Sequence, residues 1–390
     1  MMTLTLALRN LLGAGLRTWL NVIALSFSFV AIIFLQGFYN GLNDQVERAT
    51  IDALYAGGQY WNKAYDPFDP LSLDDAHGVP APELQTLIND HKATPILITR
   101  GTIYPQGRFR SILLKGIDPN QQIISIPSTL LRDTSLGIPA LIGSRMARSI
   151  NLKKGDVLTV QWRDAHGTFD ARDVTIAEVF RTSVQDIDND QVWIPLDRFR
   201  QLVRMDREAT LVVLGKGVTP AAHIADWNFR DLSFLLSDIH SLVRMKSIGA
   251  SIMYGLLLFL AMLAIFDTQV LSIWRRRKEM GTLMALGMTR TKLVGLFTLE
   301  GALHSALAAL VAALYGIPLL AVAANKGFSL PNASDSLGFA IGEKLFPVYS
   351  PFLVIGTTLL VCAVTTVVSF MPTRKIAHLK PTDALRGKMT

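Results

Sequence analysis

Four long blocks of apolar residues constrain this chain more than any other feature of its sequence. They cover residues 19–38, 248–274, 293–324 and 351–372, and the first carries no charged side chain. A helix rises about 1.5 Å per residue, so twenty apolar residues reach about 30 Å, the thickness of the hydrocarbon core of a bilayer. The blocks therefore predict four transmembrane helices.

The first block needs an alternative to be weighed, because a cleaved signal peptide is also apolar. Its apolar region is longer than such a peptide needs, and no small-residue cleavage site follows. An uncleaved span is therefore favoured. Residues 1–17, whose only charges are Arg9 and Arg17, are expected to form an interfacial helix, so that residues 1–39 make up this helix and the first span.

Positive charge gathers beside the apolar blocks. The net charge of the 390 residues is +7, of which residues 275–292 carry +5 and the tail at 373–390 carries +4, whereas residues 40–247 carry −2. This uneven distribution argues against a nucleic-acid partner and favours contact with membrane lipid. Short cationic loops stay in the cytoplasm. Both termini and residues 275–292 are therefore predicted to be cytoplasmic, and residues 40–247 and the short loop at 325–350 extracytoplasmic.

Residues 40–247 are long enough for a folded domain with its own core. Alternating and turn-bounded runs predict an α+β domain that ends in a helical stalk continuous with the second span. Strands are expected at 96–99, 108–117, 157–162, 174–180, 191–195 and 211–215, and helices at 82–89, 140–150, 196–203 and from 221 onward. The single cysteine, Cys362, excludes a disulfide within the chain.

The segment 275–287, RRRKEMGTLMALG, lies between the second and third spans. Met280, Leu283, Met284 and Gly287 have the i, i+3, i+4, i+7 spacing of one helix face. We expect a small cytoplasmic helix whose apolar face docks into a groove on a partner. The alternative is a basic loop that only orients its neighbours.

Two acids lie within the predicted spans, where charge is costly and often functional. Asp267 is close enough to Arg275 to pair with a cation or to reach the membrane interface, which is the preferred interpretation. Glu300 and His304 share a helix face at i, i+4 spacing. They are expected to make an interhelical hydrogen bond or to face a partner domain, and a proton relay is the less favoured alternative.

Sequence motifs for catalysis are missing from the chain. It has no G-x-x-x-x-G-K-[ST] phosphate loop, no H-E-x-x-H zinc motif and no G-x-S-x-G nucleophile elbow. We therefore expect no catalytic residue, cofactor or metal site in this protein, and any ATP it depends on must be bound elsewhere.

Several short motifs together resemble one family. The run from Arg277 to Gly281, then Ala285-Leu286-Gly287, then Glu300-Gly301 resembles the R-x-E-I-G…ALG…E-G signature of the MacB/FtsX/LolC superfamily of ABC transporter permeases. The opening and the tail are also similar to that family. The outer region adds G-x-D-P, I-G-x-x-x-A and K-x-G-D marks at Gly116–Pro119, Ile142–Ala147 and Lys153–Asp156, which resemble its periplasmic core domain. Asp267 stands where the family usually has Asn.

The resemblance implies a type VII ABC permease of the bacterial inner membrane, which pairs with a second permease and binds a separate ATPase that holds ATP and Mg²⁺. Residues 275–292 would contain the coupling helix and pass motion to the outer domain. The ATPase-coupling residues would be Arg277, Lys278, Glu279, Met280, Gly281, Leu283, Met284, Ala285, Leu286 and Gly287.

Within the family, the lipoprotein-releasing LolC/LolE-like branch is favoured, because the outer marks and a chain of this length without a fused ATPase are similar to it. A MacB-like efflux subunit and an FtsX-like regulator of a cell-wall hydrolase are alternatives. A membrane-anchored receptor without an ATPase is the alternative of another class, and the patterned face of residues 275–287 counts against it.

Overall fold

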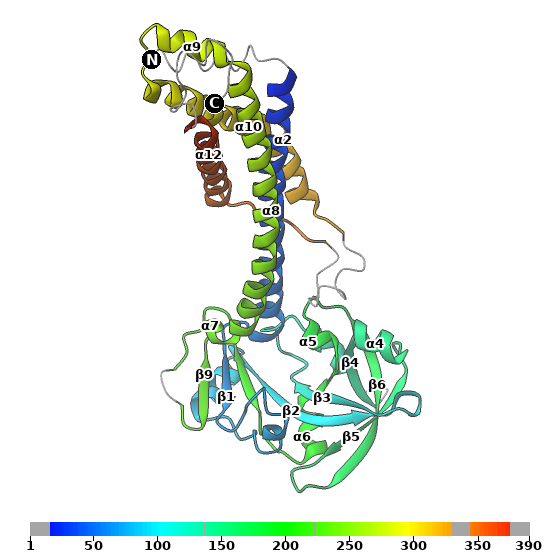
Figure 1. Cartoon of the computed structure of the whole chain (residues 1–390). Helices are drawn as coiled ribbons and strands as arrows, with labels where there is room; N and C mark the ends of the chain where they lie inside the picture. Colours follow the sequence, from blue (N-terminus) through cyan, green and yellow to red (C-terminus); the bar gives the residue numbers. More distant parts are fainter. Residues whose placement is uncertain (1–15, 134, 136, 222–223, 330–343, 375–390) are drawn as a thin grey trace. The chain divides into compact units, whose positions relative to one another are not determined.

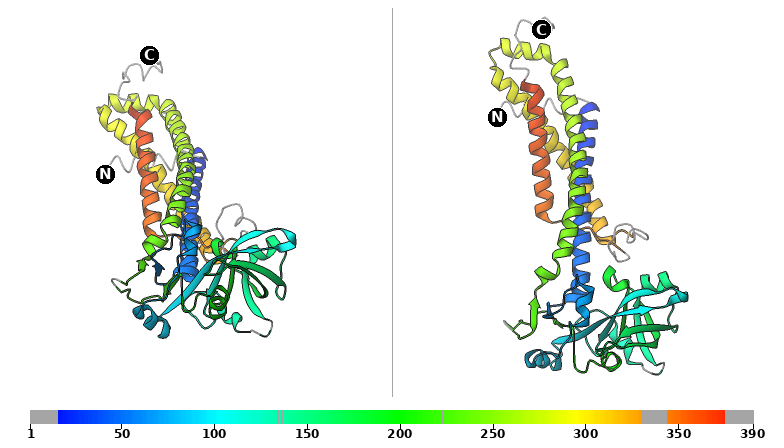
Figure 2. Two further views of the ribbon diagram at one scale, coloured as in Figure 1. Left: turned by 90° about the horizontal axis from the view of Figure 1, so that it is seen from below. Right: turned by 60° about the horizontal axis from the view of Figure 1, so that its bottom comes forward.

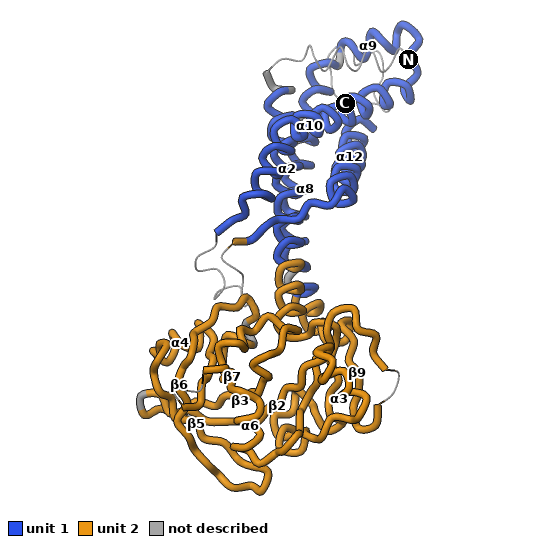
Figure 3. The backbone as a smooth tube through the Cα atoms, turned by 180° about the vertical axis from the view of Figure 1, so that it is seen from behind, with its two compact units in different colours: residues 1–42, 243–329, 345–390 blue, residues 43–242, 330–344 orange. Residues whose placement is uncertain are grey.

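A computed structural model describes residues 16–133, 135, 137–221, 224–329 and 344–374 (Figure 1). The chain divides into two compact units, shown in Figure 3. The helical unit contains residues 1–42, 243–329 and 345–390, and the sheet unit contains residues 43–242 and 330–344. Residues 1–15 of the expected interfacial helix and residues 375–390 of the tail lie outside the described residues.

Among its described residues, the helical unit contains four helices that are long and apolar enough to cross a membrane. They are α2 (Leu16–Thr50), α8 (Ser237–Arg275), α10 (Arg290–Lys326) and α12 (Pro351–Arg374). Each contains one of the four apolar blocks, as the sequence predicts. The last helix, α12, continues two residues beyond its apolar block to Arg374, and Pro372 lies in its final turn.

Apolar side chains from all four helices share one core in this unit. Val22 and Phe29 of α2, Ile265 of α8, Ala308 of α10 and Val361 of α12 are buried in it. Within the unit α2 and α8 run alongside each other in both views of Figure 2. Gly316 allows α10 to approach α2, because a Cβ at this position would lie 2.7 Å from a methyl carbon of Val30.

Two of the helices extend beyond their apolar blocks. The first does not stop near residue 39, because α2 continues to Thr50 and is followed by a π-helical turn at Ile51–Tyr55. The expected stalk before the second span is not one continuous helix. Asp231 caps a short α7 (Leu232–Leu235), and α8 begins afterwards at Ser237. The division between the two units falls inside α2 and α8.

In the part of the chain that the structure describes, the sheet unit has nine strands in the order β3-β7-β4-β6-β5-β2-β8-β1-β9. Since β3 also pairs with β2, the strands β2, β3, β7, β4, β6 and β5 form a closed ring, and β8, β1 and β9 continue the sheet from β2. The pairs β3–β7 and β4–β6 are parallel, and the others are antiparallel. The bounds are β1 Gln59–Asn62, β2 Ala93–Ile103, β3 Arg110–Ile117, β4 Ile138–Gly143, β5 Val157–Arg163, β6 Phe169–Phe180, β7 Gln191–Pro195, β8 Leu211–Leu214 and β9 Trp227–Arg230.

Besides α7, the described residues of this unit form the short helices α3 (Pro82–Asn89), α4 (Ser144–Ile150), α5 (Gln185–Asp188) and α6 (Leu196–Val203). The expected helix at 140–150 is wrong over its first part, because Ile138–Gly143 is the buried strand β4. A short apolar run does not distinguish a buried strand from a helix. The helical pattern expected from residue 221 is also wrong, since the edge strand β9 occupies Trp227–Arg230.

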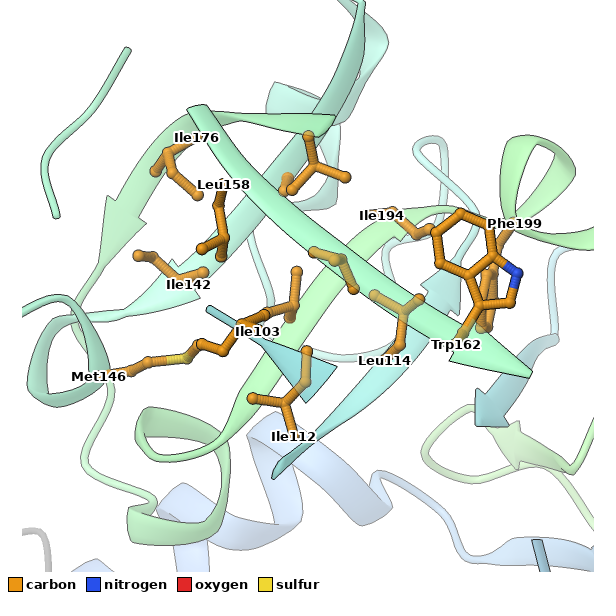
Figure 4. Packing of buried hydrophobic residues seen from close by; sticks show 14 of the residues in the cluster. Ile103, Ile112, Leu114, Ile142, Met146, Leu158, Trp162, Ile176, Ile194 and Phe199 are labelled. Atoms are coloured by element: carbon orange, nitrogen blue, oxygen red, sulfur yellow. The ribbon is translucent and has the colours of Figure 1, made fainter. Parts of the chain in front are cut away.

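The largest buried core of the sheet unit lies where the strands of the ring face one another. Figure 4 shows Ile103 and Leu114 from neighbouring strands, Trp162 from β5 and Phe199 from α6 packed together. These four side chains are each 2% exposed or less. A core of this kind holds the unit together without a disulfide, because burial of large apolar side chains is the main favourable contribution to folding.

Candidate coupling site between helices α8 and α10

The short helix α9 (Arg277–Ala285) connects α8 to α10 and contains most of the residues that the sequence marks for coupling. It ends in a Schellman motif, in which Met288 N–H donates to Leu283 O at 3.0 Å and Gly287 N–H donates to Met284 O at 3.1 Å. Gly287 has a φ of +95°, a conformation that costs a residue with a Cβ more than it costs glycine. The glycine of the A-L-G motif therefore ends the helix.

The apolar face of α9 is covered by this chain itself. Met280 is fully buried against Leu293 and Phe297 of α10, and Leu283 and Met284 are partly buried beside them. The expectation that this face is free to dock into a partner is therefore wrong. The i, i+3, i+4 spacing is that of a face packed on a neighbouring helix, and periodicity alone does not identify the neighbour.

The opposite face of α9 is the one that a partner can reach. Lys278, Glu279, Thr282, Ala285 and Leu286 are exposed on it, and Leu286 is 80% exposed. This face includes four of the residues that the sequence marks for ATPase coupling, namely Lys278, Glu279, Ala285 and Leu286. Two other marked residues, Met280 and Gly281, are buried. Leu286 is the one large apolar side chain among the described residues of this face.

An ion pair ties the start of α9 to α10. Arg276, the N-cap residue of α9, places Nη1 2.9 Å from Oε2 of Glu300, and its Nε lies 2.8 Å from Oε2 of Glu279. The guanidinium also lies 5.2 Å from the ring centroid of Phe297. The Glu300 side chain is 5% exposed, so this carboxylate depends on Arg276 for compensation of its charge.

Electrostatics keep Arg276 charged at this junction. Burial by itself lowers the pKa of Arg276, but the hydrogen bond that Arg276 donates to Glu279 and the charge of Glu300 raise this pKa above its ordinary value. Arg276 therefore stays cationic, and its bonds to Glu279 and Glu300 join two elements. The residue types in the sequence identify Glu300 but not its partner, because Arg276 lies 24 positions earlier in the chain.

The remaining membrane residues have different surroundings. His304 donates from Nδ1 to the carbonyl oxygen of Glu300 at 2.8 Å, within its own helix. The expected interhelical bond is thus made by Glu300 to Arg276 and not by His304. Asp267 is exposed on α8, and among the described residues it makes no ion pair, so the expected pairing with Arg275 is not formed.

The motif residues of the sheet unit that resemble the family lie in turns and at closely packed positions. A Cβ at Gly116 would lie 2.6 Å from the ring of Phe199, so this glycine admits α6 against β3. Gly143 similarly admits Asp188, whose carboxylate accepts a hydrogen bond from the backbone N–H of Arg145 at 3.0 Å. Asp156 accepts from the N–H of Lys153 at 2.7 Å. These residues hold the local fold, and the described residues contain no group of three metal-ligating side chains.

Comparison with known proteins identifies both parts of the chain. Residues 18–228 match the model of the MacB-like periplasmic core domain, and residues 251–381 match the FtsX-like permease C-terminal model. The chain is 19% identical over 329 residues to the lipoprotein-releasing system transmembrane protein LolC of Neisseria meningitidis serogroup B, which covers 75% of this chain and 77% of that protein.

A solved structure that is similar is the extracellular domain of the noncanonic ABC-type transporter YknZ from Gram-positive bacteria. It is 13% identical, covers 47% of this chain and 94% of its own, and has a TM-score of 0.26. The first family model alone spans more than half of this sequence, and the two matches lie in the order that the four membrane helices and the intervening sheet unit require. The chain belongs to the MacB/FtsX/LolC family of ABC transporter permeases.

Proposed function

We propose that this chain acts as the permease subunit of an ABC transporter, since membership of its family implies an ABC ATPase partner and dimerisation. We propose that the exposed face of α9 is the surface on which the ATPase acts. We further propose that ATP hydrolysis on that partner moves α10 and α8, and through α8 the sheet unit. ATP and Mg²⁺ belong to the ATPase in this account, and the permease itself performs no catalysis.

The ion pair between Arg276 and Glu300 is the observation that carries this proposal. It joins α9 to α10 at one point, and Met280 joins them at a second. A push on α9 is therefore passed to α10 instead of being lost in a flexible loop. α8 and α2 both continue from the helical unit into the sheet unit, which gives the motion a path along covalent helices.

The cargo that we propose is an acylated lipoprotein, released from the outer face of the inner membrane. The LolC relative supports this branch, because its match covers three quarters of both chains. The outer G-I-D-P and I-G-S-R-M-A marks agree with it. The orientation used here, with both termini and α9 in the cytoplasm and residues 40–247 outside, rests on the distribution of loop cations.

Co-purification tests the docking surface. The full chain is purified in mild detergent from membranes that contain its ABC ATPase, as the natural sequence and as Leu286→Glu. A charge at an apolar anchor weakens an interface, so the yield of bound ATPase should fall about tenfold. Phe109→Glu is the matched control, because Phe109 is also 80% exposed but lies in the sheet unit. Equal ATPase yields from all three proteins would refute the surface.

Release from proteoliposomes tests the cargo. The permease–ATPase complex is reconstituted with an acylated lipoprotein and a soluble carrier, and transfer to the carrier is measured with and without ATP. ATP-dependent transfer is the expected result. ATP hydrolysis without transfer would contradict lipoprotein release and favour an efflux subunit or a regulator of a hydrolase, which are distinguished by a periplasmic adaptor or a hydrolase as the bound partner.

A further inference from the structure

A groove lies between α10 and α12 at the end of the helical unit that carries Arg290 and Arg374. Its volume is about 540 Å³. Between the two arginines the wall is made of apolar and small side chains: Thr291, Val294, Gly295, Thr298, Leu299 and Ala302 from α10, and Thr366 and Phe370 from α12. None of the described residues that line it is acidic. The groove thus combines an apolar body with a cationic mouth.

Helical spacing explains how two helices build this groove. Arg290, Val294, Thr298 and Ala302 recur every four residues along α10, so they share one face, and Thr366, Phe370 and Arg374 do the same along α12. Thr298 Oγ1 lies 3.0 Å from Oγ1 of Thr373, which holds the two helices together at the floor. No atom lies within 4 Å of a Cβ built at Gly295, so the groove is open above this glycine.

The charges at the mouth are available to an anion. Arg290 and Arg374 are both exposed, and neither makes an ion pair with another described residue. Arg290 is the first residue of α10, and the side chain of the N-cap residue Thr289 makes no capping hydrogen bond. The first backbone N–H groups of a long helix attract negative charge and therefore add to the arginines.

We propose that this groove binds an anionic phospholipid, with its headgroup phosphate on Arg290 and Arg374 and an acyl chain along the apolar wall. A small soluble anion would satisfy the arginines and leave the wall bare. An apolar protein segment would cover the wall and leave two cations without compensation. A lipid with a negative headgroup supplies both parts, and basic pockets between membrane helices on the predicted cytoplasmic side are suited to such headgroups.

This site goes beyond the proposed coupling and does not depend on which cargo is carried. α10 forms one wall of the groove and also carries Glu300, the partner of Arg276. A bound lipid therefore restrains the same helix that holds α9. The lipid composition of the membrane would then affect how firmly the coupling helix is held.

Native mass spectrometry of the full chain tests the proposal directly. The protein is released from micelles that contain equal amounts of phosphatidylglycerol and phosphatidylcholine with identical acyl chains. Preferential retention of phosphatidylglycerol is expected. Arg290→Gln should weaken its retention about fivefold, and Arg290→Gln with Arg374→Gln about 25-fold. Lys292→Gln is the matched control, because Lys292 is an exposed cation of α10 outside the groove, and it should retain the lipid.

A second variant separates the wall from the charges. Gly295→Leu fills the open groove, keeps both arginines and should lose the lipid. Equal retention of the two phospholipids by the natural protein would overturn the proposal, as would equal losses in Arg290→Gln and Lys292→Gln. Inorganic phosphate that raises the melting temperature as much as phosphatidylglycerol would also overturn it, because the wall would then play no part. A Val294→Cys disulfide between two copies in membranes would show that protein covers the groove.

Discussion

At the scale of single residues, the junction of α8, α9 and α10 depends on one buried carboxylate and its cation. Glu300 is compensated by Arg276, which also contacts Glu279 and the ring of Phe297. The sequence identifies Glu300 as a residue to explain, since an acid within a membrane span is unusual. It does not identify Arg276 as the partner, because the turn between α8 and α9 brings Arg276 to Glu300.

Removal of one member of this pair should destabilise the helical unit. Glu300→Ala removes the buried partner of Arg276 and leaves it only the exposed Glu279, so it should lower the free energy of unfolding by about 3 kcal/mol. Arg276→Met with Glu300→Leu should recover much of this loss. Glu279→Gln is the control, because the Glu279 side chain is 62% exposed, and it should cost under about 0.5 kcal/mol. Denaturation in detergent measures the natural protein and the three variants, and a double variant no more stable than Glu300→Ala would contradict the pairing.

The glycine that ends α9 offers a second test at this scale. Gly287→Ala forces a Cβ into a left-handed conformation and should cost about 1 kcal/mol. Gly249→Ala in α8 is the control, because nothing lies within 4 Å of its Cβ position and its backbone is helical. The melting temperatures should therefore differ between the variants. A loss of stability in Gly249→Ala as large as in Gly287→Ala would refute this account of the A-L-G motif.

At the scale of elements, the length and periodicity of apolar runs predicted where most helices and strands lie. They did not predict what packs against each face of those elements. The four spans, α3 and α6 could be predicted from the sequence, because the signals that define each of them are local. These signals are the prolines and the apolar spacing found within or next to the helix itself. β4 was mistaken for helix, since a short apolar run fits both structures. The Met280 face was mistaken for a free surface, since only the tertiary fold places Leu293 and Phe297 over it. The sequence therefore located the candidate site on α9, but it did not predict which face of α9 is exposed.

Contact between α10 and α12 should be sensitive to one glycine. A Cβ at Gly301 would lie 2.1 Å from Oγ of Ser369, so Gly301→Ala forces the helices apart and should cost about 1–3 kcal/mol. Ser369→Gly in the same protein should restore most of the loss. Gly356→Ala in α12 meets no atom within 4 Å and serves as the control. Thermal unfolding in detergent would contradict this packing if the double variant melted no higher than Gly301→Ala.

At the scale of the whole molecule, the two units have separate cores and different surroundings. The sheet unit closes a ring of strands around its own apolar cluster, which is the reason to expect that residues 43–242 fold when expressed alone. The sequence predicted a domain of this extent from its charge and turns. It did not predict the closed ring, because β2 pairs with both β3 and β5 and such register is set by residues far apart in the chain.

The stability of the isolated sheet unit should fall in acid. A hydrogen bond from Lys154 lowers the pKa of Glu178, and backbone hydrogen bonds, chiefly from Thr168, lower the pKa of Asp164. A carboxylate whose pKa is lower in the folded state stabilises it above the unfolded pKa of about 4, and this contribution is lost as pH falls through the folded pKa. The melting temperature should therefore drop between about pH 5 and pH 3.

Glu178→Gln should make that drop smaller, because the variant has no carboxylate to protonate at this position. Glu83→Gln, in an exposed glutamate of α3 that makes no ion pair with another described residue, should leave the drop unchanged. Melting curves recorded by circular dichroism at each pH measure the effect. An identical acid dependence in Glu178→Gln and the natural sequence would contradict the contribution of the Lys154–Glu178 pair.

Photo-crosslinking at Leu286 tests the central claim, that the exposed face of α9 meets the ATPase. A photoreactive amino acid replaces Leu286 in one protein and Phe109 in another, and membranes containing the ABC ATPase are irradiated. The account predicts an adduct of permease and ATPase from position 286 and none from position 109. No ATPase adduct from position 286, or an equal adduct from position 109, would contradict it.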